Sequence, residues 1–417
     1  MSTARLIWSY PIAVRLLLVN QFGVNTAFYL LIPYLATHLG GDLGMSASAV
    51  GIVLGVRTLS QQGLFLVGGT ASDRIGPRTV IITGCGLRAV GFGIFALGAS
   101  LPLLLAGSVL SGLAGALFNP AVRAYIAVEA GERKAEAFSL FNMFATAGSL
   151  AGPLIGSALL LVDFRVAALV AAGIFVVLTL AQAAVLPHRP VEPSGSSVLA
   201  DWRLVFTDRR FVGFAAAVAG LFALETQLYL VLPIHAERFT GTSSTVASLF
   251  LVSTVATLLL QLRITRVARA RLRREQSIAV GLAVMGLGFL ATSVAAAIIP
   301  AGRPHDLGEG VLRLVPVLIT VLALAIGVML AQPFAYEIVG ELAGERLAGT
   351  YFGVYYLAAG VAGAGANALI GAAIDVWGDR WAWVPALVCA LIGLGSAAAV
   401  LGVSRQHVEK GLPVQSE

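Results

Sequence analysis

The sequence has few charged side chains and almost no cysteine. Asp, Glu, Lys and Arg make up 12% of the 417 residues, whereas they form about a quarter of an ordinary soluble domain. The two cysteines, Cys85 and Cys389, both lie inside apolar stretches, so neither a disulfide framework nor a metal site is predicted. With 58% hydrophobic residues, the composition excludes an ordinary soluble domain and indicates a protein of the lipid bilayer.

Motifs for nucleotide binding and for catalysis are also missing. The sequence has no Gly-x-x-x-x-Gly-Lys loop for ATP phosphates. It also has no His-Glu-x-x-His pair, nucleophile elbow or paired catalytic carboxylates in its apolar stretches. We therefore predict that the protein is not driven by ATP, is not an enzyme and needs no cofactor. The net charge of +6 is expected to reflect membrane topology, with no nucleic acid as a partner.

Apolar runs of roughly twenty residues recur along the whole chain, each long enough to cross about 30 Å of hydrocarbon as a helix. Helices are expected because lipid cannot satisfy the backbone groups of an open strand. The first run lacks a convincing signal-peptide cleavage site, so we count it as a span. We predict an all-α integral membrane protein with twelve transmembrane helices, at about 11–37, 47–71, 77–99, 101–128, 136–161, 164–187, 210–237, 243–267, 276–299, 311–340, 346–372 and 381–404.

The Lys and Arg residues of the loops indicate how the chain is oriented in the membrane. Most of the 27 Lys and Arg residues fall on one side if the N-terminus is cytoplasmic, so both termini are expected in the cytoplasm and the protein in the cell inner membrane. A Pro- and Ser-rich stretch at 187–197 is typical of a flexible linker, and 201–210 is expected to form a short amphipathic helix. The predicted parts are 1–187, a six-helix bundle; 188–209, a cytoplasmic linker; and 210–417, a second six-helix bundle with a cytoplasmic tail.

The two halves of the chain repeat each other. A shift of 213 residues aligns Asn119-Pro120 with Gln332-Pro333, and a shift of 200 residues aligns 26–36 with 226–236. Halves related in this way are expected to enclose a substrate site near the middle of the bilayer.

Two motifs resemble those of a known family. The turn Gly69-Thr-Ala-Ser-Asp73-Arg74-Ile-Gly76-Pro-Arg78 resembles the signature loop between spans 2 and 3 of the major facilitator superfamily. The segment Gly148-Ser-Leu-Ala-Gly152-Pro153-Leu-Ile-Gly156-Ser157 resembles the span 5 motif of proton-antiporting exporters in that superfamily. The resemblance extends over the whole chain and implies the major facilitator fold, with two pseudo-symmetric six-helix bundles.

The resemblance implies a gate at the first motif. Asp73 is expected to hold the N-terminus of the eleventh span, where a carboxylate is favourable, and Arg74 to reach Glu129 or Glu132. Alternatively, Asp73 and Arg74 only cap helix ends. Arg269 takes the place of Asp73 in the second half, so one gate is expected. The implied gating residues are Gly69, Asp73, Arg74, Gly76, Arg78 and Glu129.

The second motif, formed by Gly148, Gly152, Pro153 and Gly156, implies a bend in span 5 that seals the cavity between the bundles. A departure from the family pattern lies in span 4, where Ser108 precedes Ser111-Gly112 and the usual Arg is absent. A proton-relay role for that Arg therefore cannot be transferred to this chain.

Ionisable residues inside spans are costly and are candidates for function. Glu225, in the middle of span 7, is the first candidate for a proton carrier, because desolvation favours a protonated carboxyl. Glu337 is the second, and Arg57 or Arg123 could pair with either. Each could instead be structural, and Arg88 is expected to be peripheral and to hold its own bundle together.

Polar side chains at four-residue spacing on spans 1 and 7 are expected to face the cavity. The predicted substrate-binding residues are Gln21, Phe22, Asn25, Tyr29, Asn119, Phe222, Glu225, Gln227, Tyr229, Gln332 and Tyr336.

The resemblance is strongest to the twelve-span drug:proton antiporter branch of the superfamily. It implies a monomeric multidrug exporter that works by alternating access, takes the proton gradient as its energy source and expels small amphiphilic compounds. Three alternatives stay open. The first is an exporter of a narrow substrate, such as a natural product, a siderophore or a lysophospholipid. The others are a symporter and a membrane protein that does not transport, such as a sensor.

Overall fold

The computed structural model describes residues 3–39, 43–45, 47–98, 100–160, 162–187, 197–241, 245–344, 346–377 and 381–409. These residues form helices and short connections, and no strand occurs among them, which confirms the all-α prediction. The chain divides into two compact units. Unit 1 is Met1–Thr207 together with Val339–Leu357, and unit 2 is Asp208–Ile338 together with Ala358–Glu417.

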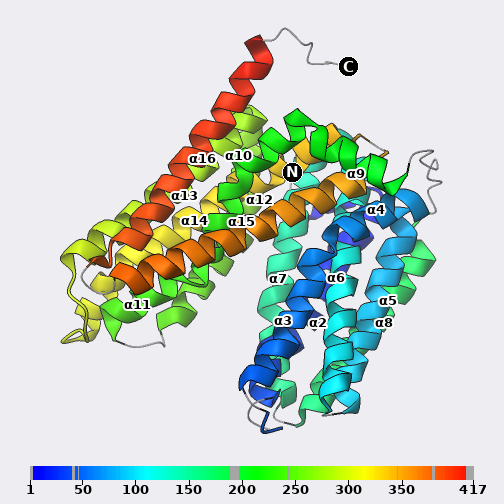
Figure 1. The fold of residues 1–417 in the computed structure, drawn as a ribbon, viewed down its shortest axis with the longest axis horizontal. Helices are drawn as coiled ribbons and strands as arrows, with labels where there is room; N and C mark the ends of the chain where they lie inside the picture. Colours follow the sequence, from blue (N-terminus) through cyan, green and yellow to red (C-terminus); the bar gives the residue numbers. More distant parts are fainter. Residues whose placement is uncertain are drawn as a thin grey trace. The chain divides into compact units, whose positions relative to one another are not determined.

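Unit 1 is a bundle of long helices connected by short turns (Figure 1). Helix α2 packs on α7 and α8, α5 packs on α6 and α8, and α3 packs on α6. Glycines allow close approach, since a Cβ on Gly91 of α5 would meet the backbone of α6 at 3.0 Å. The helices are α1 Thr3–Trp8, α2 Ile12–Thr37, α3 Ala47–Gly63, α4 Phe65–Ile75, α5 Pro77–Leu97, α6 Leu101–Glu129, η2 Gly131–Arg133, α7 Lys134–Leu160, α8 Phe164–Val185 and α9 Val198–Thr207.

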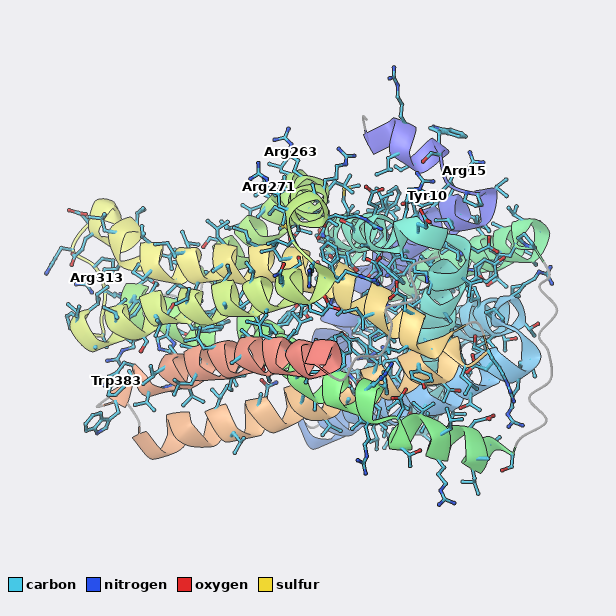
Figure 2. The ribbon with its side chains drawn as sticks, turned by 90° about the horizontal axis from the view of Figure 1, so that it is seen from above. Tyr10, Arg15, Arg263, Arg271, Arg313 and Trp383 are labelled. Carbon is cyan, nitrogen blue, oxygen red and sulfur yellow. The ribbon has the colours of Figure 1, made fainter. Side chains whose placement is uncertain are left out.

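Unit 2 is also helical, and its main packing joins α16 to α13 and α10. Figure 2 shows Arg313 and Trp383 at one end of its helices and Arg263 and Arg271 toward the other. The last residues of α14 and the first part of α15 belong to unit 1. The helices are α10 Arg209–Glu225, η3 Thr226–Leu228, α11 Val231–Thr240, α12 Val246–Arg271, α13 Arg274–Ile298, α14 Leu307–Ala343, α15 Ala348–Trp377 and α16 Val384–Glu409.

Ten helical stretches of the described chain are long and apolar enough to cross a membrane. They match ten of the twelve predicted spans. The other two predicted spans correspond to α3 with α4 and to α15. The prediction of a single helix over 47–71 is wrong, because the helix is interrupted at Leu64, where φ is −104° and ψ is 7°. The pieces, 17 residues in α3 and 11 in α4, are each shorter than the roughly 20 residues with which a helix crosses a bilayer.

Two further boundaries differ from the prediction. Span 7 is not one continuous helix, since α10 ends at Glu225 and a 3-10 turn leads into α11. The short amphipathic helix is α9, Val198–Thr207, and not 201–210. It ends there because the Asp208 side chain accepts hydrogen bonds from the backbone N–H groups of Arg210 and Phe211 and thereby starts α10. Residues 188–196 of the predicted linker lie outside the described chain.

Candidate functional site

The Asp73 carboxylate is bound at the N-terminus of α15, and all of these contacts lie within unit 1. It accepts hydrogen bonds from the backbone N–H of Gly349 (2.6 Å), the backbone N–H of Thr350 (2.6 Å) and the Thr350 hydroxyl (2.5 Å). The first N–H groups of a helix have no partner inside the helix, so an anion there satisfies them and meets the positive end of the helix dipole. Asp73 therefore attaches α4 to α15.

Glycines allow the two helices to come this close. A Cβ on Gly69 of α4 would overlap the Gly349 carbonyl of α15, and a Cβ on Gly349 would overlap the Gly69 carbonyl. Gly353, one turn further along α15, lies against the carbonyl of Phe65 in the same way. The Gly69 of the sequence motif thus serves close approach between helix backbones.

The turn after Asp73 needs its glycine for a different reason. Gly76 has a φ of 91°, a conformation that is costly for residues with a side chain, and it lies between α4 and α5. Pro77 occupies the first turn of α5, where its missing N–H has no cost. Arg78 then donates to the carbonyls of Leu186 (2.7 Å) and Ala183 (2.6 Å) at the end of α8.

Burial and hydrogen bonding have opposite effects on Asp73, which lies beyond the predicted span 47–71. Burial is the larger effect, and it raises the pKa of Asp73 from 3.8 to about 7. The bonds from Thr350 and Gly349 lower the pKa, and the nearby Asp201 raises it further. Asp73 therefore titrates close to neutral pH.

Helix α9 attaches to the same place. Arg74, next to Asp73, forms an ion pair with Asp201 of α9 at 2.8 Å. Trp202 of α9 donates from its indole N–H to the Thr70 hydroxyl at 2.7 Å. The predicted contact of Arg74 with Glu129 or Glu132 stays a prediction, whereas its bond to Asp201 links the motif to α9, the helix of the predicted linker.

Aromatic side chains extend the contact between α15 and the rest of unit 1. The rings of Phe65 and Tyr356 lie 5.3 Å apart, and those of Phe138 and Phe352 lie 6.2 Å apart. Arg123 stacks its guanidinium over Tyr356 at 4.7 Å and donates to the Asn119 carbonyl at 3.1 Å. Arg123 is therefore part of the packing around this gate.

The glycines of the second motif form a strip on α7 that packs on α2. A Cβ on Gly148 would meet Phe22 and Asn25, one on Gly152 would meet Thr26 and Tyr29, and one on Gly156 would meet Leu30 and Tyr34. The Tyr34 hydroxyl donates to the Pro153 carbonyl at 2.9 Å. Backbone runs against backbone along the strip, so α2 and α7 are held in one register.

This packing involves the polar side chains predicted on α2. Asn25 donates to the Gln21 carbonyl at 2.9 Å and, like Tyr29, is half-buried. Gln21 is buried, and Phe22 is 38% exposed. The fully buried Asn20, which the sequence analysis did not single out, leaves both polar atoms of its amide without a hydrogen bond among the described residues.

In unit 2, the polar residues predicted on span 7 lie where α10 breaks. Glu225 is the last residue of α10 and is half-buried. Gln227 is fully buried in the 3-10 turn and donates to the side chain of Asn367 on α15 at 3.0 Å. Tyr229 is 67% exposed, with its ring 5.3 Å from Phe250. Because the helix is interrupted here, Glu225 and Tyr229 do not follow one continuous helical face.

Glu337 of α14 lies against two arginines of unit 2. Its carboxylate is 3.6 Å from Arg269 of α12 and 3.9 Å from Arg274 of α13. Arg269 is the residue that replaces Asp73 in the second half of the chain. The second half thus contains an ion pair between helices at its counterpart of the gating loop. The remaining candidates include half-buried Phe222 and Asn119 and buried Gln332 and Tyr336.

The interior of unit 1 holds two further arginines. Arg57 of α3 donates to Gln61 at 3.2 Å and lies over the ring of Phe28. The prediction that Arg88 is peripheral is wrong, because its side chain is 5% exposed and lies between the rings of Phe118 and Phe175. Its position among α5, α6 and α8 agrees with the expectation that it holds its own bundle together.

Comparison with known proteins identifies the family. The model of the Major Facilitator Superfamily matches residues 17–367. The chain belongs to this superfamily. An uncharacterized MFS-type transporter of Mycobacterium tuberculosis is 45% identical over 305 residues, 72% of each chain. Multidrug resistance protein MdtH of Proteus mirabilis is 32% identical over 292 residues, 70% of this chain and 71% of that one.

Solved structures of the superfamily share the fold. The fucose:proton symporter FucP of E. coli gives a TM-score of 0.74 at 15% identity, over 94% of this chain and 98% of that one. A POT family transporter in complex with 5-aminolevulinic acid gives 0.70 at 15% identity, over 96% and 99% of the two chains. This likeness is one of fold alone. As a superfamily member, the chain is a multi-pass membrane transporter and not an enzyme.

Sequence reasoning placed Asp73 at the N-terminus of the eleventh span but missed the individual partners of the motif residues in this superfamily member. Thr350, Asp201 and Trp202 are ordinary polar or aromatic residues in the sequence, and their positions carry no motif. A signal was nevertheless present for Thr350, since Ser, Thr and Gly are typical of helix N-termini and Gly349-Thr350 follows a loop. Among the described residues, no cluster of His, Cys, Asp or Glu could hold a metal ion.

Proposed function

We propose that this transporter exports small amphiphilic compounds, drugs among them, in exchange for protons that enter down their gradient. The observation that carries the proposal is the glycine strip of α7, whose three glycines lie against the backbone of α2. In the superfamily, a strip of this sequence pattern is typical of proton-antiporting exporters. The similarity to a multidrug resistance protein supports the same class of substrate.

The Asp73 contact would act as the gate of the transport cycle. Alternating access requires one side of the protein to be held closed and then released. Three hydrogen bonds and a helix dipole act on one carboxylate, so a single small displacement of α15 would break the contact. The neighbouring Arg74–Asp201 pair would connect this release to α9.

Glu225 would carry the proton. It ends α10 at the break in span 7, and interrupted membrane helices are common at the binding sites of transporters. Glu337 is the second candidate, although its two arginine neighbours also support a structural role. Arg57 and Arg123 stay candidate partners of the proton carrier.

We further propose twelve spans, with α3 and the part of α4 up to residue 71 forming one interrupted span and α15 another. The protein would lie in the cell inner membrane as a monomer, with both termini in the cytoplasm. The surplus of Lys and Arg in the loops predicted to be cytoplasmic supports this orientation.

Movement of a lipophilic cationic dye in proteoliposomes with an imposed pH gradient tests the proposal. The intact protein should move dye against its concentration gradient, and Glu225→Gln should bind the dye without coupling to the gradient. Glu237→Gln is a matched control, because Glu237 is an exposed carboxylate of the neighbouring α11.

The possible outcomes separate the alternatives. If Glu225→Gln couples as well as the intact protein, the proton carrier is another residue and Glu337→Gln is examined next. If the intact protein ignores the gradient for every dye, multidrug antiport is the wrong function. An exporter of a narrow substrate, or a lysophospholipid flippase, then takes its place.

A further inference from the structure

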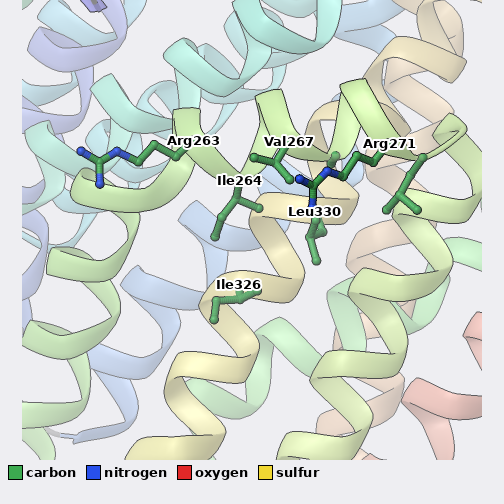
Figure 3. Close-up of a pocket in the computed structure, with 8 residues that line it drawn as sticks. Arg263, Ile264, Val267, Arg271, Ile326 and Leu330 are labelled. Carbon is green, nitrogen blue, oxygen red and sulfur yellow. The ribbon is translucent and has the colours of Figure 1, made fainter.

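A groove of about 430 Å³ lies between α12 and α14 in unit 2, at the Arg271 end of α12 (Figure 3). Its floor is apolar and consists of Ile264 and Val267 of α12 and Ile326 and Leu330 of α14. It opens on the surface of a helix whose candidate membrane span is Ser248–Arg271. The groove therefore lies near the end of a span, where a helix leaves the hydrocarbon for the headgroups.

The packing of α12 on α14 closes one end of the groove. Ala256 of α12 packs with Ala325 and Met329 of α14, and Leu260 and Ile264 cover this cluster. Beyond the cluster, α12 presents the small side chain of Ala268. A small residue there leaves the side of Leu330 uncovered by protein.

Two arginines lie at the edges of this apolar floor. Figure 3 shows the Arg271 side chain extending back along α12 toward Leu330, whereas Arg263 extends away at the other end of the groove. Both are exposed, and neither has a hydrogen bond or ion pair with any part of the chain that the structure describes. By contrast, Arg269 and Arg274 are within 4 Å of Glu337.

The charged residues that line the groove, Arg263 and Arg271, are of one sign. Six arginines occur between residues 263 and 274, and Glu275 is the first acidic residue after them. An uncovered apolar floor beside an unpaired guanidinium at the end of a span matches a lipid, with an acyl chain for the floor and a negative headgroup for the arginine. A free phosphate ion would leave the floor uncovered, and a cationic amphiphile would be repelled.

We propose that this groove binds an anionic phospholipid of the membrane leaflet at the Arg271 end of α12. The phosphate contacts Arg271, Arg263 adds a second positive charge, and one acyl chain covers Ile264, Val267, Ile326 and Leu330. This site is independent of what the protein transports.

Native mass spectrometry of the full chain tests the site. The protein is taken from vesicles of equal parts phosphatidylcholine and phosphatidylglycerol, and the lipids that stay bound are counted. We expect the intact protein to retain phosphatidylglycerol preferentially. Arg271→Gln should lower this preference about fivefold, the equivalent of about 1 kcal/mol for one arginine near a membrane surface. Arg271→Lys should retain most of it.

Two further variants separate the groove from general surface charge. Arg209→Gln with Arg210→Gln removes two exposed arginines at the start of α10, outside the groove, and should leave the preference unchanged. Val267→Trp fills the groove without altering charge and should reduce the binding of both lipids.

Three results would overturn the proposal. The first is an intact protein that retains the two lipids equally. The second is an equal loss of preference in the Arg271 variant and in the Arg209 and Arg210 variant, which would indicate general electrostatics. The third is a dimer that Arg271→Gln dissociates, which would assign the groove to a second copy of the chain.

Discussion

Two opposing effects act on the charge of the Asp73 side chain. The N-terminus of α15 offers it three hydrogen bonds, which favour the charged form, whereas burial beside Asp201 favours the neutral form. A side chain held between these effects is poised to change its charge with a small change of environment. That property suits a contact which has to form and break during each transport cycle.

Removal of the Thr350 hydroxyl should weaken the gate. Thr350→Val keeps the shape of this fully buried side chain and deletes one of the three donors to Asp73, at a cost of about 1.5–3 kcal/mol for a bond to a charged group. Thr350→Ser retains the hydroxyl and is the matched control. The unfolding temperature in detergent and the rate of dye transport should both fall for Thr350→Val. Both should stay near the values of the intact protein for Thr350→Ser. Identical behaviour of the two variants would mean that the hydroxyl bond contributes nothing.

Asp73 should also make stability depend on pH. Its pKa in the folded protein is about 7, above the ordinary value of 3.8, so the folded protein binds a proton that the unfolded chain does not bind between these values. Its contribution to stability is therefore fully present below about pH 4 and is lost as pH rises through about 7. Melting temperatures from pH 5 to 8 should fall more for the intact protein than for Asp73→Asn. Parallel curves would contradict this assignment.

At the scale of helices, the sequence was informative about lengths and motifs and less informative about which helices are interrupted. Ten of twelve predicted spans correspond to helices that can cross a membrane, because hydropathy reports length directly. The interruption at Leu64 directly follows Gly63, and the one after Glu225 is followed by Pro233 in the first turn of α11. Gly and Pro both weaken a helix, but neither residue by itself fixes whether the helix stops. The outcome depends on tertiary packing, as do the contacts of Arg74 and Thr70 with α9.

The glycine strip of α7 predicts a sharp contrast between two glycine substitutions. A Cβ in Gly152→Ala would approach the Thr26 carbonyl at 2.7 Å and the Tyr29 Cβ at 2.8 Å, so α7 would have to move away from α2. Overpacking of this kind costs about 1–3 kcal/mol. Gly173→Ala, in α8, meets nothing within 4 Å and is the matched control. The unfolding temperature and the rate of transport should fall for Gly152→Ala only. A fall in both variants would point to helix flexibility instead of packing.

For the molecule as a whole, the two sequence repeats have diverged at corresponding places. The first repeat binds a helix N-terminus through Asp73, and the second has Arg269 there, facing Glu337. The repeat could be recognised from aligned residues such as Asn119-Pro120 and Gln332-Pro333. The family resemblance also pointed to the N-terminus of the eleventh span as the contact of Asp73, whereas the partner of Arg269 could not be predicted, because Glu337 lies on a helix distant in the sequence.

Cysteine labelling should report the orientation of the whole chain. Cys85 and Cys389 are both fully buried, so the natural protein should resist a membrane-impermeant maleimide in intact cells. Ala301→Cys and Ser197→Cys introduce thiols at exposed positions in connections predicted to lie on opposite sides. The first should label in intact cells and the second only after the membrane is opened. The reverse pattern would invert the topology.

The bond from Gly349 to Asp73 joins residues 276 positions apart, which matters for how the protein is made. A ribosome adding about 5–20 residues per second needs roughly 14–55 s between these two residues. Toward the end of that time the first six spans exist, but Val339–Leu357, which completes unit 1, does not. An N-terminal half expressed alone, ending at the linker, would therefore be an unfinished unit, and its Asp73 would lack the donors of α15 for as long as it exists.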